Sequence, residues 1–398
     1  MNCQLRDYVQ SGEVEIRTGP FGTQLKASEY VEQGTPVLNV KNLGYSTVVK
    51  SKLDRVGPST IERLSMHILH RGDIVFGRKG AVDRHAYISS DEDGWMQGSD
   101  CIRVRVKTET INPRFLSYYF LTPEHRAFMI SMCSHGTTMA SLNQKILEMI
   151  EVPLPDRSVQ DGIVSLLGIL DNKIELNQKI NENLQQQLLA IYDEMVATCE
   201  IRKSVELKTL CAFQEGYVNP PQTHPEYFNG SVKWLRAVDI NESFIIETSR
   251  TLTTDGFESA KKSALLFQPN TVAISKSGTI GRIGIVADFM CGNRAVINIR
   301  PLNPTQLPLI YVFLKSKQRE FPDLAVGSVQ KNLYVSLLEP LLVDLPETEM
   351  LDQFCDIGNS LLERMQTNCK ENLVLANLRN ALLPKLMSSE IDVSDIQI

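Results

Sequence analysis

Two short segments contain residue types used by nucleotide-modifying enzymes, and each lacks a part that the chemistry needs. Adenine methyltransferases use an Asn/Asp-Pro-Pro-aromatic motif, in which the aromatic residue stacks on the flipped base. Here Asn219-Pro220-Pro221 is followed by Gln222, and no Gly-x-Gly cofactor loop lies upstream. We therefore interpret this segment as a turn.

The second segment is Gly278-Thr279-Ile280-Gly281-Arg282-Ile283-Gly284, which follows a predicted strand. It lacks the Gly-Lys-Ser/Thr sequence of a phosphate-binding loop, and no acidic partner for a metal ion is placed near it. The eight cysteines form no Cys-x-x-Cys pair, and we interpret His67 and His70 as structural or solvated. No catalytic or metal site is expected.

Two long helices are predicted, each with a heptad-like stripe of apolar residues. Steps of three and four residues are typical of the seam of a coiled coil. The first stripe is Leu167, Leu170, Ile174, Asn177, Asn181, Leu184, Leu188, Ile191 and Met195. The second is Leu361, Met365, Asn368, Asn372 and Leu375, then Leu378 and Leu382 after one irregular step.

Both stripes contain a pair of asparagines at mid-length, Asn177 with Asn181 and Asn368 with Asn372. If the helices pack antiparallel, the four amides lie opposite one another and fix the register at some cost in stability. Parallel pairing also aligns them, so the direction depends on connectivity. The alternative is two unrelated amphipathic helices that face separate cores.

The ends of these helices are marked by prolines and a capping signal. Pro155 precedes the first helix and Pro346 the second. Ser158 with Asp161 resembles a capping box, so the first helix is expected from near there to about Thr198, a length of roughly 60 Å. The second is expected to begin near Glu349 and to end or kink at Pro384.

The globular parts also repeat. Residues 73–80 align with 271–278 as an apolar strand running into a basic, glycine-containing turn, and 101–105, 118–121 and 136–142 align with 296–300, 311–314 and 327–333. Two copies of about 190 residues predict a pseudo-twofold internal repeat. The short strands, with one helix expected around Arg114 to Ser131, favour a mixed α/β (α+β) fold.

Charge is distributed unevenly among four predicted segments. The globular domains 1–155 and 201–346 have net charges of +1 and +3, whereas the helical segments 156–200 and 347–398 have −5 each, within a total of −6. The domains are compatible with local basic patches that touch phosphates, although this balance by itself is poor evidence for DNA binding. No apolar run reaches membrane-spanning length, no signal peptide opens the chain, and a cytoplasmic location is expected.

The chain resembles the specificity subunit of type I restriction-modification systems across essentially its full length. The resemblance rests on the motifs at residues 19–23 and 34–38, on Pro155 to Gln160 leading into 170–181, and on 361–364 and 378–386. The helical motifs are fairly specific. The globular motifs are looser, as expected where each member reads a different DNA sequence.

The resemblance implies two target recognition domains separated by two long helices that form an antiparallel coiled coil. Each domain would read one half of a bipartite site in double-stranded DNA, and the coiled coil would set the unread spacer. The implied partners are two DNA adenine methyltransferase (modification) subunits and restriction/translocase subunits. S-adenosylmethionine, ATP and magnesium would be bound by those partners and not by this chain, which would be a guide without catalysis in a bacterial or archaeal cytoplasm.

DNA contacts need Arg, Lys, Asn and Gln side chains on loops for bases, and Ser, Thr, Lys and backbone amides for phosphates. Each candidate could instead be a solvated turn residue, and Tyr45, Tyr217 and Trp234 could stack on bases or be buried. The candidates in the first domain are Thr23, Lys41, Asn42, Arg78, Lys79, Thr137 and Thr138. Those in the second are Lys276, Ser277, Thr279, Arg294, Ser328, Gln330 and Lys331.

Two other classes of function stay open on the sequence alone. One is a two-domain scaffold that binds proteins without reading DNA, and the other is a degenerate enzyme. Salt-dependent, sequence-selective DNA binding in the presence of a methyltransferase subunit would distinguish a specificity subunit from both.

Overall fold

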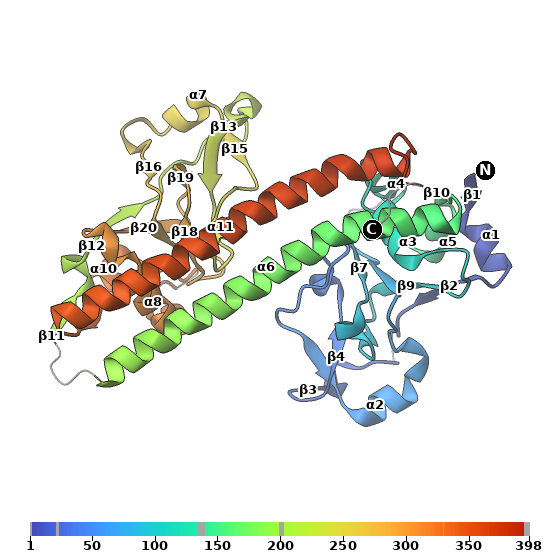
Figure 1. Ribbon diagram of the computed structural model, residues 1–398, viewed down its shortest axis with the longest axis horizontal. Coiled ribbons are helices and arrows are strands. Elements are labelled where there is room, and N and C mark those ends of the chain that lie inside the picture. Colours follow the sequence, from blue (N-terminus) through green and yellow to red (C-terminus); the bar gives the residue numbers. More distant parts are fainter. Residues whose placement is uncertain (1, 21–23, 134–139, 199–202, 329, 394–398) are drawn as a thin grey trace. The chain divides into compact units, whose positions relative to one another are not determined.

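The computed structural model describes residues 2–20, 24–133, 140–198, 203–328 and 330–393 (Figure 1). The chain divides into two compact units, which we call the first unit (Met1–Asp171 and Asn377–Ile398) and the second unit (Asn172–Ala376). Two long helices, α6 (Arg157–Thr198) and α11 (Thr348–Met387), each contribute residues to both units. Both helices predicted from the apolar stripes are therefore present.

In the described part of the first unit, the strands form three small sheets, and five short α-helices accompany them. Its central sheet is fully antiparallel, and a second sheet contains one parallel pair. The central sheet has the order β2 (Val14–Thr18), β9 (Cys101–Val106), β6 (Ile74–Gly77), β7 (His85–Tyr87). The second has the order β3 (Tyr30–Val31), β5 (Asp54–Val56), β4 (Thr35–Leu38), β8 (Met96–Gln97), and β1 (Asn2–Gln4) pairs with β10 (Glu151–Pro153). The helices are α1 (Leu5–Gln10), α2 (Pro58–Arg63), α3 (Pro113–Tyr119), α4 (Pro123–Cys133) and α5 (Gln144–Glu148).

The second unit has the same three kinds of sheet. Its central sheet has the order β12 (Cys211–Glu215), β20 (Val296–Pro301), β17 (Thr271–Ser275), β18 (Ile283–Val286), β14 (Phe244–Ile245). The other sheets are β15 (Thr251–Leu252), β13 (Phe228–Leu235), β19 (Met290–Gly292), β16 (Leu266–Phe267) in that order, and β11 (Lys203–Glu206) with β21 (Leu342–Leu345). The helices are α7 (Thr254–Glu258), α8 (Leu307–Lys317), α9 (Phe321–Leu324) and α10 (Val335–Leu338).

Strand register confirms the internal repeat. In the first unit Phe76 of β6 lies opposite Ile102 of β9, and in the second unit Ile274 of β17 lies opposite Ile297 of β20. The parallel pair β4–β8 likewise has a counterpart in β13–β19. The strands that the sequence aligned therefore occupy the same positions in the two central sheets, and the mixed α/β fold class is confirmed.

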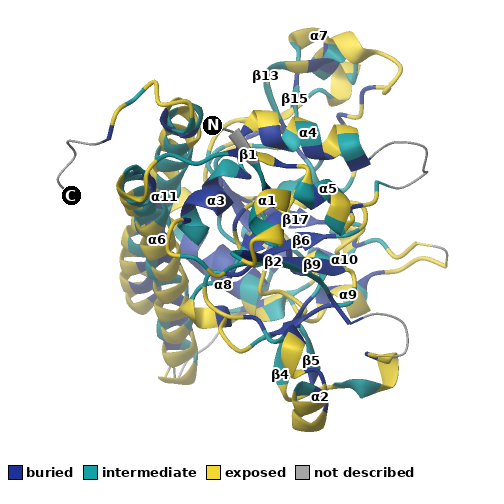
Figure 2. Ribbon diagram, turned by 90° about the vertical axis from the view of Figure 1, so that its right-hand side faces the viewer, coloured by how far each residue is buried: buried dark blue, intermediate teal, exposed yellow. Residues whose placement is uncertain are grey.

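The central strand of each unit is buried along its whole length. Every residue of β6 and of β17 is buried, and both strands are dark in Figure 2. Their residues are mostly apolar. They do not alternate between apolar and polar, as in a strand with one solvent-exposed face, because each strand has neighbours on both edges and packing on both faces. A buried strand is a rigid support for the turn that follows it.

The single helix expected around Arg114 to Ser131 is two helices. The first, α3, ends at Tyr119, and α4 begins at Pro123. A proline has no backbone N–H and disfavours helical geometry in the residue before it, so the chain turns at Thr122 and starts a new helix. The prediction of one continuous helix was wrong because the apolar pattern continues across this break.

Within the second unit, α6 and α11 pack through the predicted asparagines. The Asn177 amide donates to Asn372 Oδ1 at 2.9 Å, and the Asn368 amide donates to Asn181 Oδ1 at 2.8 Å. From Asn177 to Asn181 along α6, the partner residue on α11 changes from Asn372 to Asn368, so the two helices run antiparallel. The prediction that these four asparagines pair across the helices is confirmed, although the Asn177 Oδ1 atom is buried without a hydrogen-bond partner.

Within the first unit, the seam contains a charged pair that the apolar pattern did not reveal. Arg379 of α11 donates to Asp171 of α6 at 2.8 Å, and Leu383 is buried beside Leu167. The predicted seam residue Leu378 is instead 45% exposed. The seam thus continues from Leu375 by a four-residue step to Arg379, and including Leu378 was wrong because a charged residue occupies the next seam position.

Two details of the helix ends also differ from the prediction. The first helix begins at Arg157, so Ser158 lies inside it, and the Asp161 carboxylate accepts from Asn112 at 2.6 Å in place of closing a capping box with Ser158. Of the two outcomes predicted at Pro384, an end or a kink, the end is wrong, because the second helix continues to Met387. Pro384 removes the hydrogen bond that its N–H would donate to the Asn380 carbonyl, but the bond after it persists, because the Ser388 N–H donates to the Pro384 carbonyl at 2.9 Å.

Candidate nucleic-acid interface

The two central strands end in equivalent basic turns. Arg78 and Lys79 follow β6, and Lys276 and Ser277 follow β17. Each turn then reaches a glycine, Gly80 or Gly278, with φ of +75°, a conformation that favours glycine because it has no Cβ. The sequence aligned these segments, and the structure gives them the same backbone geometry.

In each unit, a second segment of the chain donates a backbone hydrogen bond to this turn. The Leu142 N–H donates to the Arg78 carbonyl at 2.8 Å, and the Leu333 N–H donates to the Lys276 carbonyl at 2.9 Å. Leu142 and Leu333 are fully buried, so each anchors its loop in the core. The turn after the central strand and the anchoring leucine are therefore brought together in both units.

The candidates of the first unit differ in what they present to solvent. Lys79 is exposed and lies 3.8 Å from Asp100, and Lys41 is exposed and paired with Asp54 at 2.7 Å. Arg78 is partly buried. Asn42 is fully buried, and its amide donates to the Val49 and Ser51 carbonyls, so this side chain stabilises its own loop. Thr23, Thr137 and Thr138 lie outside the described residues.

In the second unit, Lys276 is held close to the protein. Its ammonium lies 2.9 Å from Glu215 Oε1 and 4.9 Å from the centroid of the Tyr334 ring. This pairing lowers the charge that Lys276 offers to a ligand, in contrast to Arg294, which is exposed. Ser277 is partly exposed, and Thr279 and Ser328 are exposed.

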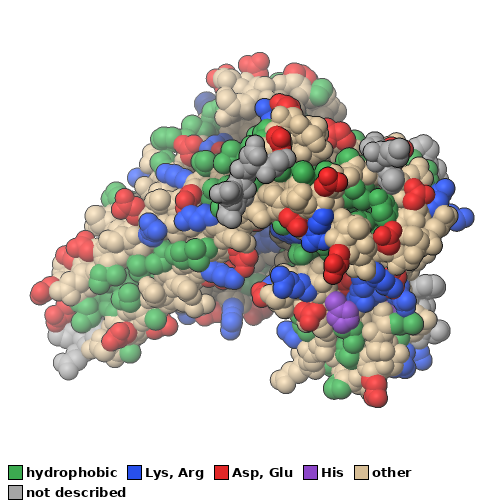
Figure 3. Space-filling view, turned by 45° about the vertical axis from the view of Figure 1, so that its right-hand side comes forward, with side chains coloured by type: hydrophobic (Ala, Val, Ile, Leu, Met, Phe, Trp, Pro, Cys, Tyr) green, Lys and Arg blue, Asp and Glu red, His purple; other side chains and the backbone are tan. Residues whose placement is uncertain are grey.

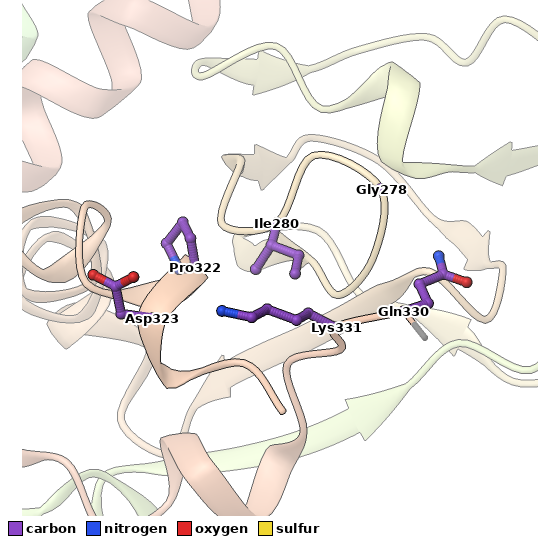
Figure 4. Close-up of a pocket in the computed structure, with 6 residues that line it drawn as sticks. All are labelled: Gly278, Ile280, Pro322, Asp323, Gln330 and Lys331. Carbon is purple, nitrogen blue, oxygen red and sulfur yellow. The ribbon is translucent and has the colours of Figure 1, made fainter. Parts of the chain in front are cut away.

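A shallow hollow lies between the two loops of the second unit (Figure 4). Gly278 and Ile280 line one side, and Gln330 and Lys331 line the other. The Lys331 side chain extends across the hollow below Ile280, with its ammonium directed toward Pro322 and Asp323 (Figure 4). Two candidates from the sequence therefore line one concave surface beside the basic turn.

The three aromatic candidates divide by burial. Trp234 is 5% exposed and donates its indole N–H to the Val218 carbonyl at 2.7 Å, so it is a core residue. Tyr217 is 50% exposed and donates to Glu215. Tyr45 is 40% exposed and remains available for contacts outside the protein.

Several basic residues of the first unit are occupied inside it. Arg103 is 1% exposed and bonds Glu15 at 2.6 Å, and Arg105 bonds Asp73 with two nitrogens at 2.7 Å. Burial raises the pKa of Glu15, but Lys107, Arg17 and Arg103 outweigh it and lower that pKa to about 2. The count of basic residues therefore overstates the charge that faces a partner, and the face seen in Figure 3 shows acidic and basic side chains interspersed.

In the first unit, Asp171 connects the globular part to the two long helices. The Asp171 carboxylate accepts from Arg114 at 2.8 Å, from the Tyr118 hydroxyl at 2.6 Å and from Arg379 at 2.8 Å. We call these four residues the Asp171 clamp. The clamp joins α3, α6 and α11, and none of its members was predicted from the sequence to be functional.

The second unit uses a different attachment at the equivalent place. Tyr311, which the repeat aligns with Tyr118, accepts from the Gln185 amide of α6, and the same amide reaches the Glu242 carbonyl at 3.2 Å. Neutral groups thus connect α8 to α6, where the first unit uses a carboxylate and two guanidinium groups. Hydrogen bonds between helix and domain exist in both copies, but only the first is ionic at this point.

Two buried histidines lie behind the interface of the first unit. His85 is fully buried with its Nε2 2.9 Å from Ser117 Oγ, and His125 lies 4.7 Å from the Phe120 ring. Burial lowers the pKa of each to about 3, and for His85 the neighbouring His125 and Arg114 side chains lower the pKa further. Both are therefore neutral at pH 7.

We expect these histidines to make the protein acid-sensitive. A group whose pKa is depressed in the folded state contributes stability that is lost as pH falls below its unfolded value near 6.5. Between pH 7 and pH 5, the wild type is expected to lose about 2 kcal/mol more unfolding free energy than His125→Phe, which keeps the aromatic packing. Urea unfolding at both pH values measures this, and parallel losses would contradict the expectation.

The enzyme-like segments contain turns, and the second of them runs into β18 at Ile283. A hydrogen-bonded turn follows Pro221, with the His224 N–H on the Pro221 carbonyl at 3.2 Å, and Gln222 accepts from Arg250. The 278–284 segment is closed by the Gly281 N–H on Ser275 and by Gln318 on the Gly281 carbonyl. Among the described residues, no cluster of three His, Cys, Asp or Glu side chains suits a metal ion, and no helix is long and apolar enough to cross a membrane.

These features define a duplicated recognition protein, in which each copy of one domain presents a basic turn and packs on an antiparallel helix pair. The family model for the type I restriction modification DNA specificity domain matches residues 15–186 and 202–362. The chain belongs to this family, and it contains two copies of the domain. Members of the family supply DNA sequence specificity and not catalysis, so the chain is not an enzyme.

Individual relatives are similar over nearly their full length. The type I restriction enzyme MjaIX specificity subunit of Methanocaldococcus jannaschii is 24% identical, over 93% of this chain and 90% of the relative. The HindI specificity subunit of Haemophilus influenzae is 20% identical, over 81% and 87%. The crystal structure of the S subunit from M. genitalium is 14% identical, with a TM-score of 0.52 over 97% of this chain and 95% of that one, which shows a shared fold.

Proposed function

We propose that this chain is the subunit that gives a type I restriction-modification complex its DNA sequence specificity, with each globular domain reading one half of a bipartite site. The observation that carries the proposal is the duplication itself. Two equivalent basic turns, each on a buried strand and each braced by a second loop, occur in a chain of the DNA specificity family. Two separate half-sites need two such readers.

Each reading domain is closed by its own ends. In the second unit, Lys203 pairs with Leu345 in the antiparallel sheet of β11 and β21, and in the first, Asn2 pairs with Pro153 in that of β1 and β10. The chain therefore enters and leaves each domain at neighbouring points. Domains with adjacent ends can be exchanged as units, which suits a family in which each half-site varies independently.

In this proposal the two long helices set the unread spacer and bind the modification subunits. The asparagine pairs support a fixed register, because a shifted register would separate each amide from its partner on the other helix. Exposed apolar residues support docking. In the second unit, Leu176 of α6 is 52% exposed and Val374 of α11 is 65% exposed, beside the ion pair of Lys173 with Glu371.

The chemistry of the complex belongs to other subunits. We propose that two DNA adenine methyltransferase subunits bind S-adenosylmethionine, and that restriction/translocase subunits use ATP and magnesium. This chain would hold none of these groups. The assembled complex would act on double-stranded DNA in the cytoplasm of a bacterium or archaeon and defend it against foreign DNA.

Methylome sequencing of the native host, with and without this gene, tests the proposal. A bipartite methylated motif should disappear when the gene is removed and return when it is restored. In vitro, the chain together with its methyltransferase subunit should bind that motif selectively, with an affinity that falls steeply as salt rises. Loss of a protein complex without any change in the methylome would favour the protein-binding scaffold.

We expect the purified chain by itself to transfer no methyl group from S-adenosylmethionine to DNA. It lacks the aromatic residue and cofactor loop that the reaction needs, since Gln222 follows Asn219-Pro220-Pro221. Tritium transfer from labelled S-adenosylmethionine measures this, and adding the modification subunit should restore transfer to adenine. Any turnover by the chain alone would contradict its assignment as a non-catalytic subunit.

A further inference from the structure

An exposed group of aromatic and charged side chains lies beside the basic turn of the first unit. Tyr45 is 40% exposed, and the guanidinium carbons of Arg126 and Arg84 lie 4.4 Å and 5.4 Å from the centroid of its ring. Asp83 accepts from the Tyr45 hydroxyl at 3.1 Å and from Arg126 at 2.9 Å. We call these four residues the Tyr45 cluster.

Within the cluster, the two arginines are held differently. Arg126 is fixed, because its Nη2 donates both to Asp83 and to the Tyr45 hydroxyl. Arg84 is exposed, and no carboxylate pairs with it among the described residues. Since Asp83 is occupied by Arg126 and Tyr45, the cluster has one net positive charge, and Arg84 presents it to solvent. An arginine against an aromatic face keeps its N–H groups free for a second partner.

The cluster is fixed to the same framework as the candidate DNA-contact turn. Asp83 and Arg84 end the segment between β6 and β7 that begins with Arg78 and Lys79. Tyr45 is connected to β7 by a parallel bridge with His85. The Tyr45 cluster and Lys79 therefore lie at the same end of the β6–β7 hairpin, so a ligand that touches Lys79 can extend onto the cluster.

Comparison of the two repeats shows that the second domain lacks an equivalent of the Tyr45 cluster. The pairing of β6 with β7 places His85 opposite Phe76, and the pairing of β17 with β18 places Ile283 opposite Ile274. By that register Arg84 corresponds to Arg282, but Asp83 corresponds to Gly281. The second domain keeps the arginine and lacks the carboxylate that anchors the first cluster.

We propose that the Tyr45 cluster is a phosphate-binding surface through which the first recognition domain holds the DNA backbone of its half-site. The inference rests on the proposed function. A guanidinium presents parallel N–H groups that match two phosphate oxygens, and the ring beneath Arg84 limits the orientations that it must give up on binding. The segment from Arg78 to Arg84 has three basic residues and one acidic residue, which is already paired, so it attracts an anionic ligand. DNA is favoured over an acidic protein segment because the domain belongs to the DNA specificity family.

Salt-dependent DNA binding tests the proposal on the whole chain in complex with its modification subunit. The probe is a duplex with the methylated motif of the host, compared with duplexes altered in either half. We expect Arg84→Ala to weaken binding about 5- to 10-fold for every duplex and to reduce the slope of log affinity against log salt by about 1. Tyr45→Ala should act in the same direction, whereas Tyr45→Phe, which keeps the ring, should change affinity less than about 2-fold.

A matched control is Arg71→Ala, an exposed arginine at the opposite end of β6 from the cluster. It should leave the salt slope unchanged. The proposal is overturned if Arg84→Ala keeps the wild-type slope, if it changes base preference in the first half-site with the slope unchanged, or if it weakens binding of the modification subunit while DNA binding stays. Absence of selective binding by the wild-type complex would instead overturn the proposed function, and the proposal with it.

Discussion

Exchanging residues 201–346 for the corresponding domain of another family member is expected to replace one half of the methylated motif and to leave the other half and the spacer unchanged. The second domain is a separate globular part whose ends pair, Lys203 with Leu345, so a substitute domain can enter and leave at the same points. The helix segments that hold the asparagine pairs lie outside the exchange. We expect the original half-sequence to be lost from the methylated motif entirely, because the new domain reads a different half-sequence in its place.

Methylome sequencing of a host that expresses the chimera measures the outcome. The reciprocal exchange of residues 1–155 is the matched control and should alter the other half only. A change in both halves, or in neither, would contradict independent reading by the two domains. A changed spacer with unchanged half-sites would show that the domains, and not the helices, set the separation.

Features of the fold and of the candidate site that depend on apolar residues could be predicted from the sequence, whereas features that depend on charged residues could not. The repeat, both helices and the asparagine pairing were predicted, because buried strands and helix seams leave a regular pattern of apolar side chains. Asn177 and Asn181 stood out because two amides interrupt an apolar stripe. Strand register was not predicted, and the structure shows it to be equivalent in the two units, with Phe76 opposite His85 and Ile274 opposite Ile283.

The remaining features depend on contacts between residues that are distant in sequence. Arg379 occupies a seam position and meets Asp171, but a charged residue in a stripe looks like an interruption until its partner is known. Asn42 has the residue type and the loop position of a base reader, yet its amide is used up by the Val49 and Ser51 carbonyls. The polar residues of a candidate site can be named from a sequence, but which of them remain free is decided by packing.

We expect Asp171→Ala to destabilise the first unit by about 2–3 kcal/mol, because the substitution leaves Arg114 and Arg379 without their common partner. The Asp171, Arg114 and Arg379 side chains are 18%, 22% and 24% exposed, so solvent replaces only part of what is lost. Arg379→Ala should cost less, about 1 kcal/mol, since Asp171 keeps its bonds from Arg114 and Tyr118. Urea unfolding at pH 7 measures both.

The double variant distinguishes a true clamp from two independent surface residues. If Asp171 and Arg379 interact as the 2.8 Å contact indicates, the loss in the double variant should be smaller than the sum of the single losses by about 1 kcal/mol. A control is Lys179→Ala in the second unit, which removes an exposed i,i+4 pair with Glu175 and should cost less than about 0.5 kcal/mol. Strict additivity, or an Asp171→Ala cost as small as that control, would show that the helices hold the first recognition domain by apolar packing alone, through residues such as Leu167 and Leu383.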